Sequence, residues 1–297
     1  MLKRLRRQAG YLTARSLVGL ARVLPRSVGA PLFGHLGRVA YLILPRSRKV
    51  TLTNLRLIYG EVLAEREIRA LAARVFANLG RFAYDAVRFG LAPAPELERV
   101  TSVSGRHHLD EALARGRGVI AITGHVGNWE LLAACLTSLG SRVTVLATRM
   151  KDARLNDVVV GLRQQLGMVV LDRSWGLREA LRCLKRGEVL GVLIDQDTSV
   201  DSVVVDFLGR PAKTAVGPVK IAARTGAAIV PMAMLMAEDG RYRLEIGQEI
   251  TIDGVDTSLV KDVERCSKAV ESFIRAEPSQ WVWMHKRWKS VVADLYS

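Results

Sequence analysis

The 297-residue sequence has only three cysteines, and they are widely separated: Cys135, Cys183 and Cys266. An odd number without paired spacing supports neither a disulfide framework nor a cysteine-based metal site, and it fits a reducing compartment. Internal repeats and low-complexity tracts are also missing. Because 49% of the residues are hydrophobic, a chain of this length can still bury a sizeable core.

Long uninterrupted apolar runs are missing as well. Residues 9–24 are largely apolar, but Arg15 and Arg22 interrupt them. The segment is too short and too charged for a clear membrane-spanning helix, and no small-residue cleavage site marks a signal peptide. Arg4, Arg15 and Arg22 fall on nearly one helical face. The apolar side chains lie largely away from it: Leu12, Leu17, Leu20 and Val23. This pattern predicts a helix in the membrane interface or an amphipathic helix packed on its own domain.

Acidic residues are few relative to basic ones. The 44 Lys and Arg against 29 Asp and Glu give a formal net charge of +15. Such an excess indicates an anionic partner, either nucleic acid or anionic lipid. No helix-turn-helix, zinc-finger or RNA-stacking signature accompanies the charge, so we expect no nucleic-acid partner. Basic charge beside apolar amphipathic segments favours a membrane surface.

The rhythm of the sequence changes near Pro93 and Pro95, which mark a break. We therefore predict an N-terminal helical, membrane-associating region over residues 1–95 and an α/β domain over residues 96–297. A second apolar run, 28–44, is either a surface helix or part of the membrane patch. In the second region short apolar runs alternate with helical patterns, which predicts a mostly parallel central sheet flanked by helices. The expected strands are 118–123, 141–147, 168–171, 189–194, 227–231 and 241–246.

The most informative stretch, residues 124–132, joins the first of these strands to a helix. His125 and Glu130 would diverge by roughly 140° on one continuous helix, so they can meet only if His125 lies in the preceding turn. Asn128 as N-cap would place Glu130 in the first helical turn. An ionised Glu130 can then accept a hydrogen bond from one imidazole nitrogen and leave the other as a base. Alternatively, His125 is a polar turn residue and Glu130 only favours the helix start.

Two carboxylates, Asp195 and Asp197, follow a later strand end, which is where ligands collect in open α/β sheets. They can bind a metal, act as acid and base, or shape a turn. Oxygen-ligated metal sites need more clustered ligands than the sequence offers here, so we expect no metal.

Residues 206–214 form a Gly/Pro segment with two cations and a hydroxyl. As a loop before a helix it can bind an anion through backbone donors around Gly209 together with Arg210 or Lys213. Thr214 would cap the following helix. An exposed basic turn is equally compatible with the composition.

The C-terminal segment 278–289 mixes three tryptophans with basic side chains. This mixture suits a lipid headgroup interface, where an indole contacts both apolar and wet surroundings. It is also compatible with a packed terminal segment that covers the sheet.

Taken together, these segments resemble the late acyltransferases of lipid A biosynthesis, the lauroyl/myristoyl-transferring family of the lysophospholipid acyltransferase superfamily. The resemblance rests on the order and spacing of five motifs and covers nearly the whole chain. The motifs are His125 to Glu130, Asp195-Gln196-Asp197, the 207–214 segment, Ile229 to Pro231 and the 278–289 segment.

The resemblance implies acyl transfer from an acyl-carrier protein or CoA thioester to a hydroxyl of a lipid A precursor or related glycolipid. It implies no permanently bound cofactor, and a location at the cytoplasmic face of the inner membrane. The acyl-carrier protein, the glycolipid and the membrane surface would be the partners. Two alternatives stay open: a phosphatidylinositol mannoside or other lysolipid as acceptor, and a non-catalytic basic membrane-binding protein.

The resemblance also suggests roles for individual residues. His125 would be the general base, Glu130 its partner and Asp195 an important acidic group. The expected substrate-binding residues are Asn128, Arg163, Asp197, Gly209, Arg210 and Thr214. The chemistry agrees, because an alcohol attacks a thioester effectively only when a base removes its proton. Backbone N–H groups at the Asn128 helix start would stabilise the oxyanion.

Overall fold

A computed structural model describes residues 2–90, 94–172, 176–197, 199–253, 255–292 and 294–296. The predicted break at Pro93 and the side chain of Arg4 lie outside the described part. In chain order the elements are α1 (Leu2–Val23), α2 (Arg26–Ile43), α3 (Pro45–Tyr59), α4 (Glu65–Phe89), α5 (Ala94–Arg99), β1 (Thr101–Ser104), α6 (Arg106–Ala114), β2 (Val119–Thr123), α7 (Trp129–Ser138), β3 (Val143–Ala147), α8 (Ala153–Gln165), β4 (Val169–Asp172), α9 (Leu177–Lys185), β5 (Val189–Leu193), β6 (Ser202–Phe207), β7 (Arg210–Ala215), α10 (Gly217–Thr225), β8 (Ala228–Met236), β9 (Tyr242–Ile246), α11 (Val255–Ala276) and the 3₁₀ turn η1 (Pro278–Gln280).

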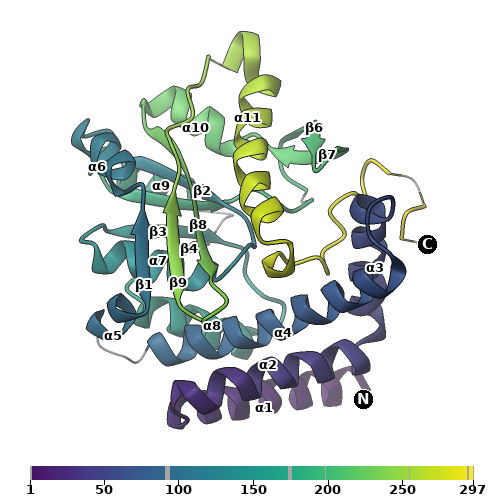
Figure 1. Cartoon of the computed structure of the whole chain (residues 1–297). Coiled ribbons are helices and arrows are strands. Elements are labelled where there is room, and N and C mark those ends of the chain that lie inside the picture. Colours follow the sequence, from purple (N-terminus) through teal and green to yellow (C-terminus); the bar gives the residue numbers. More distant parts are fainter. Residues whose placement is uncertain are drawn as a thin grey trace.

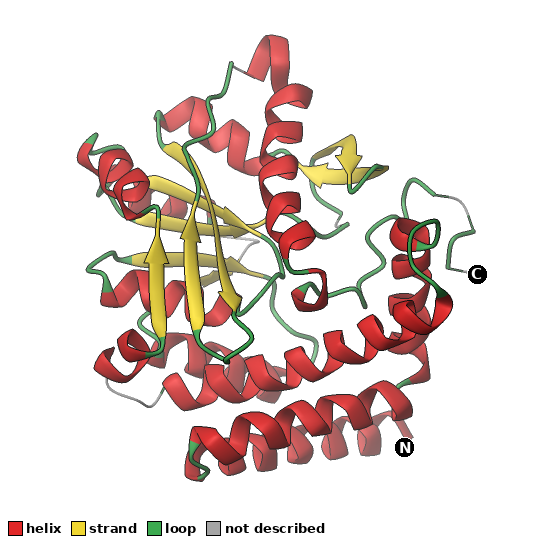
Figure 2. Ribbon diagram, in the orientation of Figure 1, coloured by secondary structure: helices red, strands yellow, loops and turns green. Residues whose placement is uncertain are grey.

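Seven strands form one sheet in the order β1-β9-β8-β2-β5-β3-β4 (Figure 1). Strand β2 lies at the centre and pairs in parallel with β5 and β8. Strands β8 and β9 are antiparallel, and β6 and β7 form a separate antiparallel hairpin. Helices surround the sheet (Figure 2). The prediction of a mostly parallel central sheet flanked by helices is therefore confirmed.

The strands differ from the prediction at three places. Strand β1 was not predicted, and segment 206–214 is not a loop but the hairpin of β6 and β7. The strand predicted over 227–231 runs on to Met236, and all nine residues of β8 are buried. Proline lacks the backbone N–H donor, but the residues after Pro231 are buried and continue the strand.

Two apolar layers cover the sheet. Ile120 and Ile122 of β2 lie in a cluster with residues of α9, α10 and α11. Val119 and Ala121, the alternate residues of the same strand, lie in a second cluster with residues of α6 and α7. Because successive strand residues point to opposite faces, β2 is covered on both sides and its carboxyl end can hold a side chain away from bulk water.

The N-terminal helices share the core of the sheet. Leu55 of α3 and both Ile68 and Val75 of α4 belong to the same apolar cluster as Ile120. Figure 1 shows α4 between the sheet and the pair α1 and α2, at the end where β8 finishes. The helical region therefore contributes directly to the wall beside the carboxyl ends of the strands.

Helix α2 packs closely on α4 through glycines. A Cβ at Gly37 would lie 2.1 Å from the Phe76 carbonyl oxygen, and one at Gly80 would lie 2.1 Å from that of Phe33. Such approaches require glycine, since real side chains do not fit at these distances. The glycine-rich character of the second apolar run therefore comes from this contact.

By length and composition, no single helix among the described residues meets the requirement for crossing a membrane. Helices α2 and α3, which bend by 92° at their junction, meet it only as a pair.

Candidate active site

The turn after β2 is arranged as the sequence predicts. Asn128 is the N-cap of α7, and its side-chain oxygen accepts a hydrogen bond from the Leu131 amide at 3.3 Å. Glu130 consequently lies in the first turn of the helix, and His125 lies in the preceding turn. Gly127 has a φ of +60°. A Cβ at Gly127 would meet the Met234 carbonyl at 2.0 Å, so the close turn needs glycine there.

The partner of His125 is Asp195. The imidazole Nδ1 lies 2.8 Å from Oδ1 of Asp195, and the backbone N–H of His125 donates to Oδ2 at 2.6 Å. Strand register produces this contact, because Thr123 pairs with Leu193 in the parallel β2 and β5 and the two contacting residues follow two positions later. Gly124 permits the approach, since a Cβ there would lie 3.0 Å from Oδ2.

Glu130 holds a different partner, so the prediction that it hydrogen-bonds to His125 is wrong. Its carboxylate accepts from Arg163 of α8 at 2.7 and 2.9 Å, and the Trp129 indole donates to it at 3.1 Å. A guanidinium offers a carboxylate two charge-assisted hydrogen bonds, which a neutral imidazole cannot do. Asp195 meanwhile occupies the Nδ1 side of the imidazole. Glu130 therefore links α7 to α8.

The surroundings of Asp195 lower the pKa of its carboxyl group. Its residue is 1% exposed. Burial alone would raise the pKa of this carboxyl, but the charge of His125 and the hydrogen bonds from His125 and Trp281 outweigh burial and lower the pKa to about 2. The Trp281 indole N–H donates to Oδ2 at 2.7 Å. Asp195 is therefore an anion at neutral pH and favours the proton on Nδ1 of His125.

The second imidazole nitrogen of His125 remains reachable. With the proton on Nδ1, Nε2 carries a lone pair, and the Gln196 amide nitrogen lies 3.3 Å from it. The imidazole side chain is 24% exposed, and the Trp129 ring lies 5.1 Å from it in an edge arrangement. This geometry suits a base that accepts a proton from a bound hydroxyl group.

Asp197 is buried and anchors the C-terminal segment. Its carboxylate accepts from the backbone N–H of Ser290 at 3.0 Å and from the Ser290 hydroxyl at 2.9 Å. Its own backbone N–H donates to Nε2 of His285 at 3.2 Å. Burial lowers the pKa of His285, which keeps this imidazole neutral and able to accept. The two aspartates of the motif therefore have different partners: Asp195 contacts His125 and Trp281, whereas Asp197 anchors the C-terminal segment.

The β6–β7 hairpin separates the three residues predicted there. Gly209 forms the tight turn with a φ of +82°, and Arg210 is an exposed residue beside it, with a side chain that is 46% exposed. Thr214 is buried in β7, where its hydroxyl accepts from Arg287 at 2.6 Å. Its predicted role as a helix cap is wrong, because α10 begins at Gly217 and has Val216 as N-cap.

The C-terminal tryptophans are packed inside the protein. Trp281, Trp283 and Trp288 are at most 1% exposed. The first two rings stack edge to face at 4.6 Å, and Phe207 lies 5.5 Å from Trp281. The packed alternative is therefore confirmed and the headgroup alternative is wrong. Nothing in the spacing of the three tryptophans indicates that Trp281 contacts Asp195.

A largely buried polar chain, which the sequence pattern did not indicate, links α2 to the turn that carries His125. Arg26 pairs with Asp85 at 2.9 Å, and the Tyr242 hydroxyl donates to the same carboxylate at 2.8 Å. The Asn128 side-chain amide then lies 3.3 Å from the Tyr242 oxygen. Burial and the nearby Asp85 charge raise the pKa of Tyr242 well above its usual value, so the phenol stays a neutral donor.

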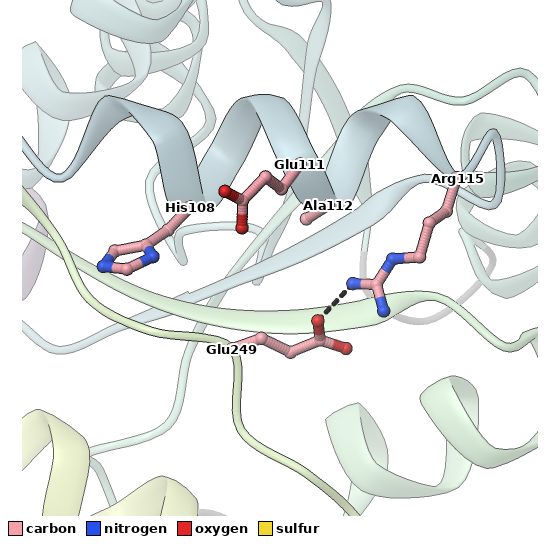
Figure 3. A pocket seen from close by; sticks show the side chains of 5 residues that line it. All are labelled: His108, Glu111, Ala112, Arg115 and Glu249. Atoms are coloured by element: carbon pink, nitrogen blue, oxygen red, sulfur yellow. Dashed lines mark hydrogen bonds and ion pairs between the residues drawn. The ribbon is translucent and has the colours of Figure 1, made fainter.

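A surface pocket lies away from this site. It is lined by His108, Glu111, Ala112, Arg115 and Glu249, and the last two form an ion pair (Figure 3). Arg115 precedes the start of β2, whereas His125 follows its end. The pocket therefore belongs to the amino edge of the sheet and contains none of the predicted site residues.

An α/β sheet that carries a histidine and a buried carboxylate at its carboxyl edge has the form of an enzyme. The class follows from sequence comparison: residues 3–290 match the model of the bacterial lipid A biosynthesis acyltransferase family. The chain belongs to this family of acyltransferases.

Named relatives agree with this assignment. A phosphatidylinositol mannoside acyltransferase of Mycobacterium tuberculosis is 29% identical over 68% of this chain, and the chain spans only 63% of that relative's length. The Mycolicibacterium smegmatis enzyme of the same name is 25% identical over 93% of this chain and 89% of its own. The lipid A biosynthesis lauroyltransferase of Escherichia coli is 27% identical over 86% of this chain and 83% of its own.

Proposed function

We propose that the chain transfers a fatty acyl group from an acyl-carrier protein or CoA thioester to a hydroxyl of a lipid A precursor or related glycolipid. The observation that supports this most is the pair of contacts between His125 and Asp195. They fix the Nδ1 side of the imidazole and leave Nε2 as the base.

The proposed reaction needs no covalent enzyme intermediate, because a thiolate is already a good leaving group. The acceptor hydroxyl takes the position beside Nε2 of His125 that the Gln196 amide now occupies. Nε2 removes the hydroxyl proton while the oxygen forms a bond to the thioester carbonyl carbon. The C–S bond then breaks, and the imidazolium returns the proton to the thiolate. Asp195 stabilises the imidazolium in between.

Oxyanion stabilisation is assigned to the first turn of α7. The amide of Gly127 donates to the Gln280 carbonyl at 3.0 Å, and that of Asn128 donates to the Met234 carbonyl at 2.8 Å. Those two amides are therefore occupied. A helix supplies no internal acceptors for the amides of its first turn, so the amides of Trp129 and Glu130 are the donors that we propose for the tetrahedral oxygen.

A phosphatidylinositol mannoside is the second candidate acceptor. Two of the relatives described above carry that activity in their names, while another is named for lipid A. Both acceptors are anionic glycolipids, and the net charge of +15 suits either of them. The same charge suits an acidic carrier protein as donor.

The test uses the full-length protein with acyl-carrier protein and CoA thioesters and with both glycolipids. Mass spectrometry detects the acylated product. We expect turnover with one donor and one acceptor, and a loss of at least about 10³-fold for His125→Ala. His107→Ala is the matched control, since this exposed histidine on α6 lies outside the site. Unchanged turnover in His125→Ala, or no turnover with any pair, would overturn the proposal.

We further propose that the bend between α2 and α3 contacts the cytoplasmic face of the inner membrane. Leu42, Ile43 and Leu44 are 63%, 67% and 46% exposed there, and the exposed Arg46 and Lys49 follow directly. An exposed apolar cluster with adjacent cations matches a surface that lies on anionic lipid.

Vesicles of phosphatidylglycerol and phosphatidylcholine test this contact. We expect the double variant Leu42→Asp, Ile43→Asp to bind at least about tenfold less in sedimentation, because two apolar contacts are lost. Leu177→Asp is the control, since Leu177 is a comparably exposed leucine on α9. Equal binding of both variants would contradict the proposed membrane face.

A further inference from the structure

We infer that Trp281 is a positioning residue of the acyl transfer, whose indole N–H fixes the Asp195 carboxylate that orients His125. The inference rests on the proposed function, because it needs His125 to act as the base. It adds a residue from the C-terminal segment to a site otherwise built at the ends of β2 and β5.

Three donors fix the orientation of the Asp195 carboxylate. Oδ1 receives Nδ1 of His125, while Oδ2 receives both the His125 backbone N–H and the Trp281 indole. If the indole were absent, Oδ2 would keep one donor, and rotation of the carboxylate would be less restricted. Groups that hold a ligand of the reacting side chain in this way affect activity without touching substrate.

The backbone around Trp281 is itself attached to the catalytic turn. Val126 and Trp281 form an antiparallel bridge, and the Val282 amide donates to the His125 carbonyl at 3.0 Å. The side chain of Gln280 makes two hydrogen bonds to the backbone of Met236, at 2.7 and 2.9 Å. One segment therefore fixes both the backbone of the base and the carboxylate of its partner.

The neighbouring tryptophans supply matched controls. Trp283 is as buried as Trp281, but its indole donates to the Pro278 carbonyl at 2.7 Å. Trp288 is also buried, and its indole nitrogen has no hydrogen-bond partner among the described residues. Replacing each by phenylalanine removes an indole from the same apolar cluster. Only the substitution of Trp281 removes a donor that contacts Asp195.

We expect Trp281→Phe to lower kcat by about 10- to 100-fold, the range for a lost hydrogen bond to a charged group. KM for the acceptor should change by less than about threefold. Trp283→Phe and Trp288→Phe should keep kcat within about threefold, although Trp283→Phe leaves the partly buried Pro278 carbonyl without its donor and lowers Tm.

The pH profile separates positioning from simple loss of packing. A carboxylate that loses a hydrogen-bond donor binds the proton that it shares with the imidazole more tightly. The acid limb of kcat/KM in Trp281→Phe should therefore move to higher pH by about half to one unit, while the limbs of the two control variants stay in place. In the Asp195→Asn background, Trp281→Phe should cause no further loss, because the group through which it acts is gone.

Two results would overturn the inference. One is wild-type kcat and pH profile in Trp281→Phe. The other is an equal loss of kcat in Trp283→Phe at an equal loss of Tm, which would reduce Trp281 to a packing role. His125→Ala in the same assay separates the two claims. If it is inactive while Trp281→Phe is unaffected, only the positioning role fails; if it keeps full turnover, the proposed function fails as well.

Discussion

Asp195 and Glu130 both lie beside the turn that carries His125, but their surroundings differ. Asp195 is 1% exposed and receives donors from His125 and Trp281. The Glu130 side chain is 21% exposed and pairs with Arg163. One carboxylate contacts the imidazole directly, whereas the other joins two helices. Proximity in sequence therefore did not decide which acid serves the histidine; strand register did, because it places residues 125 and 195 side by side.

The largest loss of acyl-transfer activity should come from removing the charge of Asp195. Asp195→Asn keeps the shape but offers an amide, which can donate to Nδ1 and leave the proton on Nε2, the wrong tautomer for a base. We expect kcat to fall by about 10³- to 10⁴-fold, measured by steady-state acyl transfer. Asp197→Asn is the matched control, and a larger loss there would reverse the assignment of the two aspartates.

A smaller loss is expected for Glu130→Gln. The amide keeps one contact to Arg163 but loses the charge, so the link between α7 and α8 weakens while His125 and Asp195 keep their hydrogen bonds. We expect kcat to fall by about tenfold, in line with a charge-assisted hydrogen bond. A loss as large as that of Asp195→Asn would show that Glu130 takes part in the proton transfer.

Stability should depend on pH through Asp195. Its pKa is about 2 in the folded chain and about 3.9 when unfolded. A lowered pKa stabilises the fold above the unfolded value, and this contribution is lost as pH falls through the folded value. The difference corresponds to roughly 2–3 kcal/mol. Urea unfolding between pH 4 and pH 2 should show the gap between wild type and Asp195→Asn narrowing; a gap independent of pH would contradict the assignment.

The smallest change in the kinetic constants is expected for a substitution in the β6–β7 hairpin. Arg210 is exposed, and its guanidinium makes two long contacts, at 3.5 Å to the Leu57 carbonyl oxygen and at 4.0 Å to the Glu61 carboxylate. If it binds the anionic acceptor, as proposed from the sequence, Arg210→Ala should raise KM by about threefold and leave kcat unchanged, since exposed ion pairs contribute little. A tenfold fall of kcat would place the hairpin in the chemical step.

Local patterns in the sequence identified much of the fold and the turn of the site. Apolar runs located the buried strands, and Asn128 was the cap that its position predicted. The alternation of strands and helices was enough for a mostly parallel sheet, since few other arrangements bury such runs on both faces.

Contacts between distant segments were harder to predict. The choice of Asp195 over Glu130 depends on strand order, and the Trp281 contact joins residues 86 positions apart. The chain from Arg26 through Asp85 to Asn128 depends on how α2 packs on α4. Thr214 was misplaced because a hairpin with buried alternate residues resembles a Gly/Pro loop in composition.

The attachment of residues 279–290 to the rest of the fold has a consequence for biosynthesis. On the ribosome, His125 and Asp195 are made long before Trp281 and Ser290, the residues that complete the hydrogen bonds of the two aspartates. Asn54, near the beginning, donates to the Trp283 and His285 carbonyls. A nascent chain therefore lacks part of the hydrogen bonding around Asp195 and Asp197 until residues 281–290 have been synthesised and have packed against them.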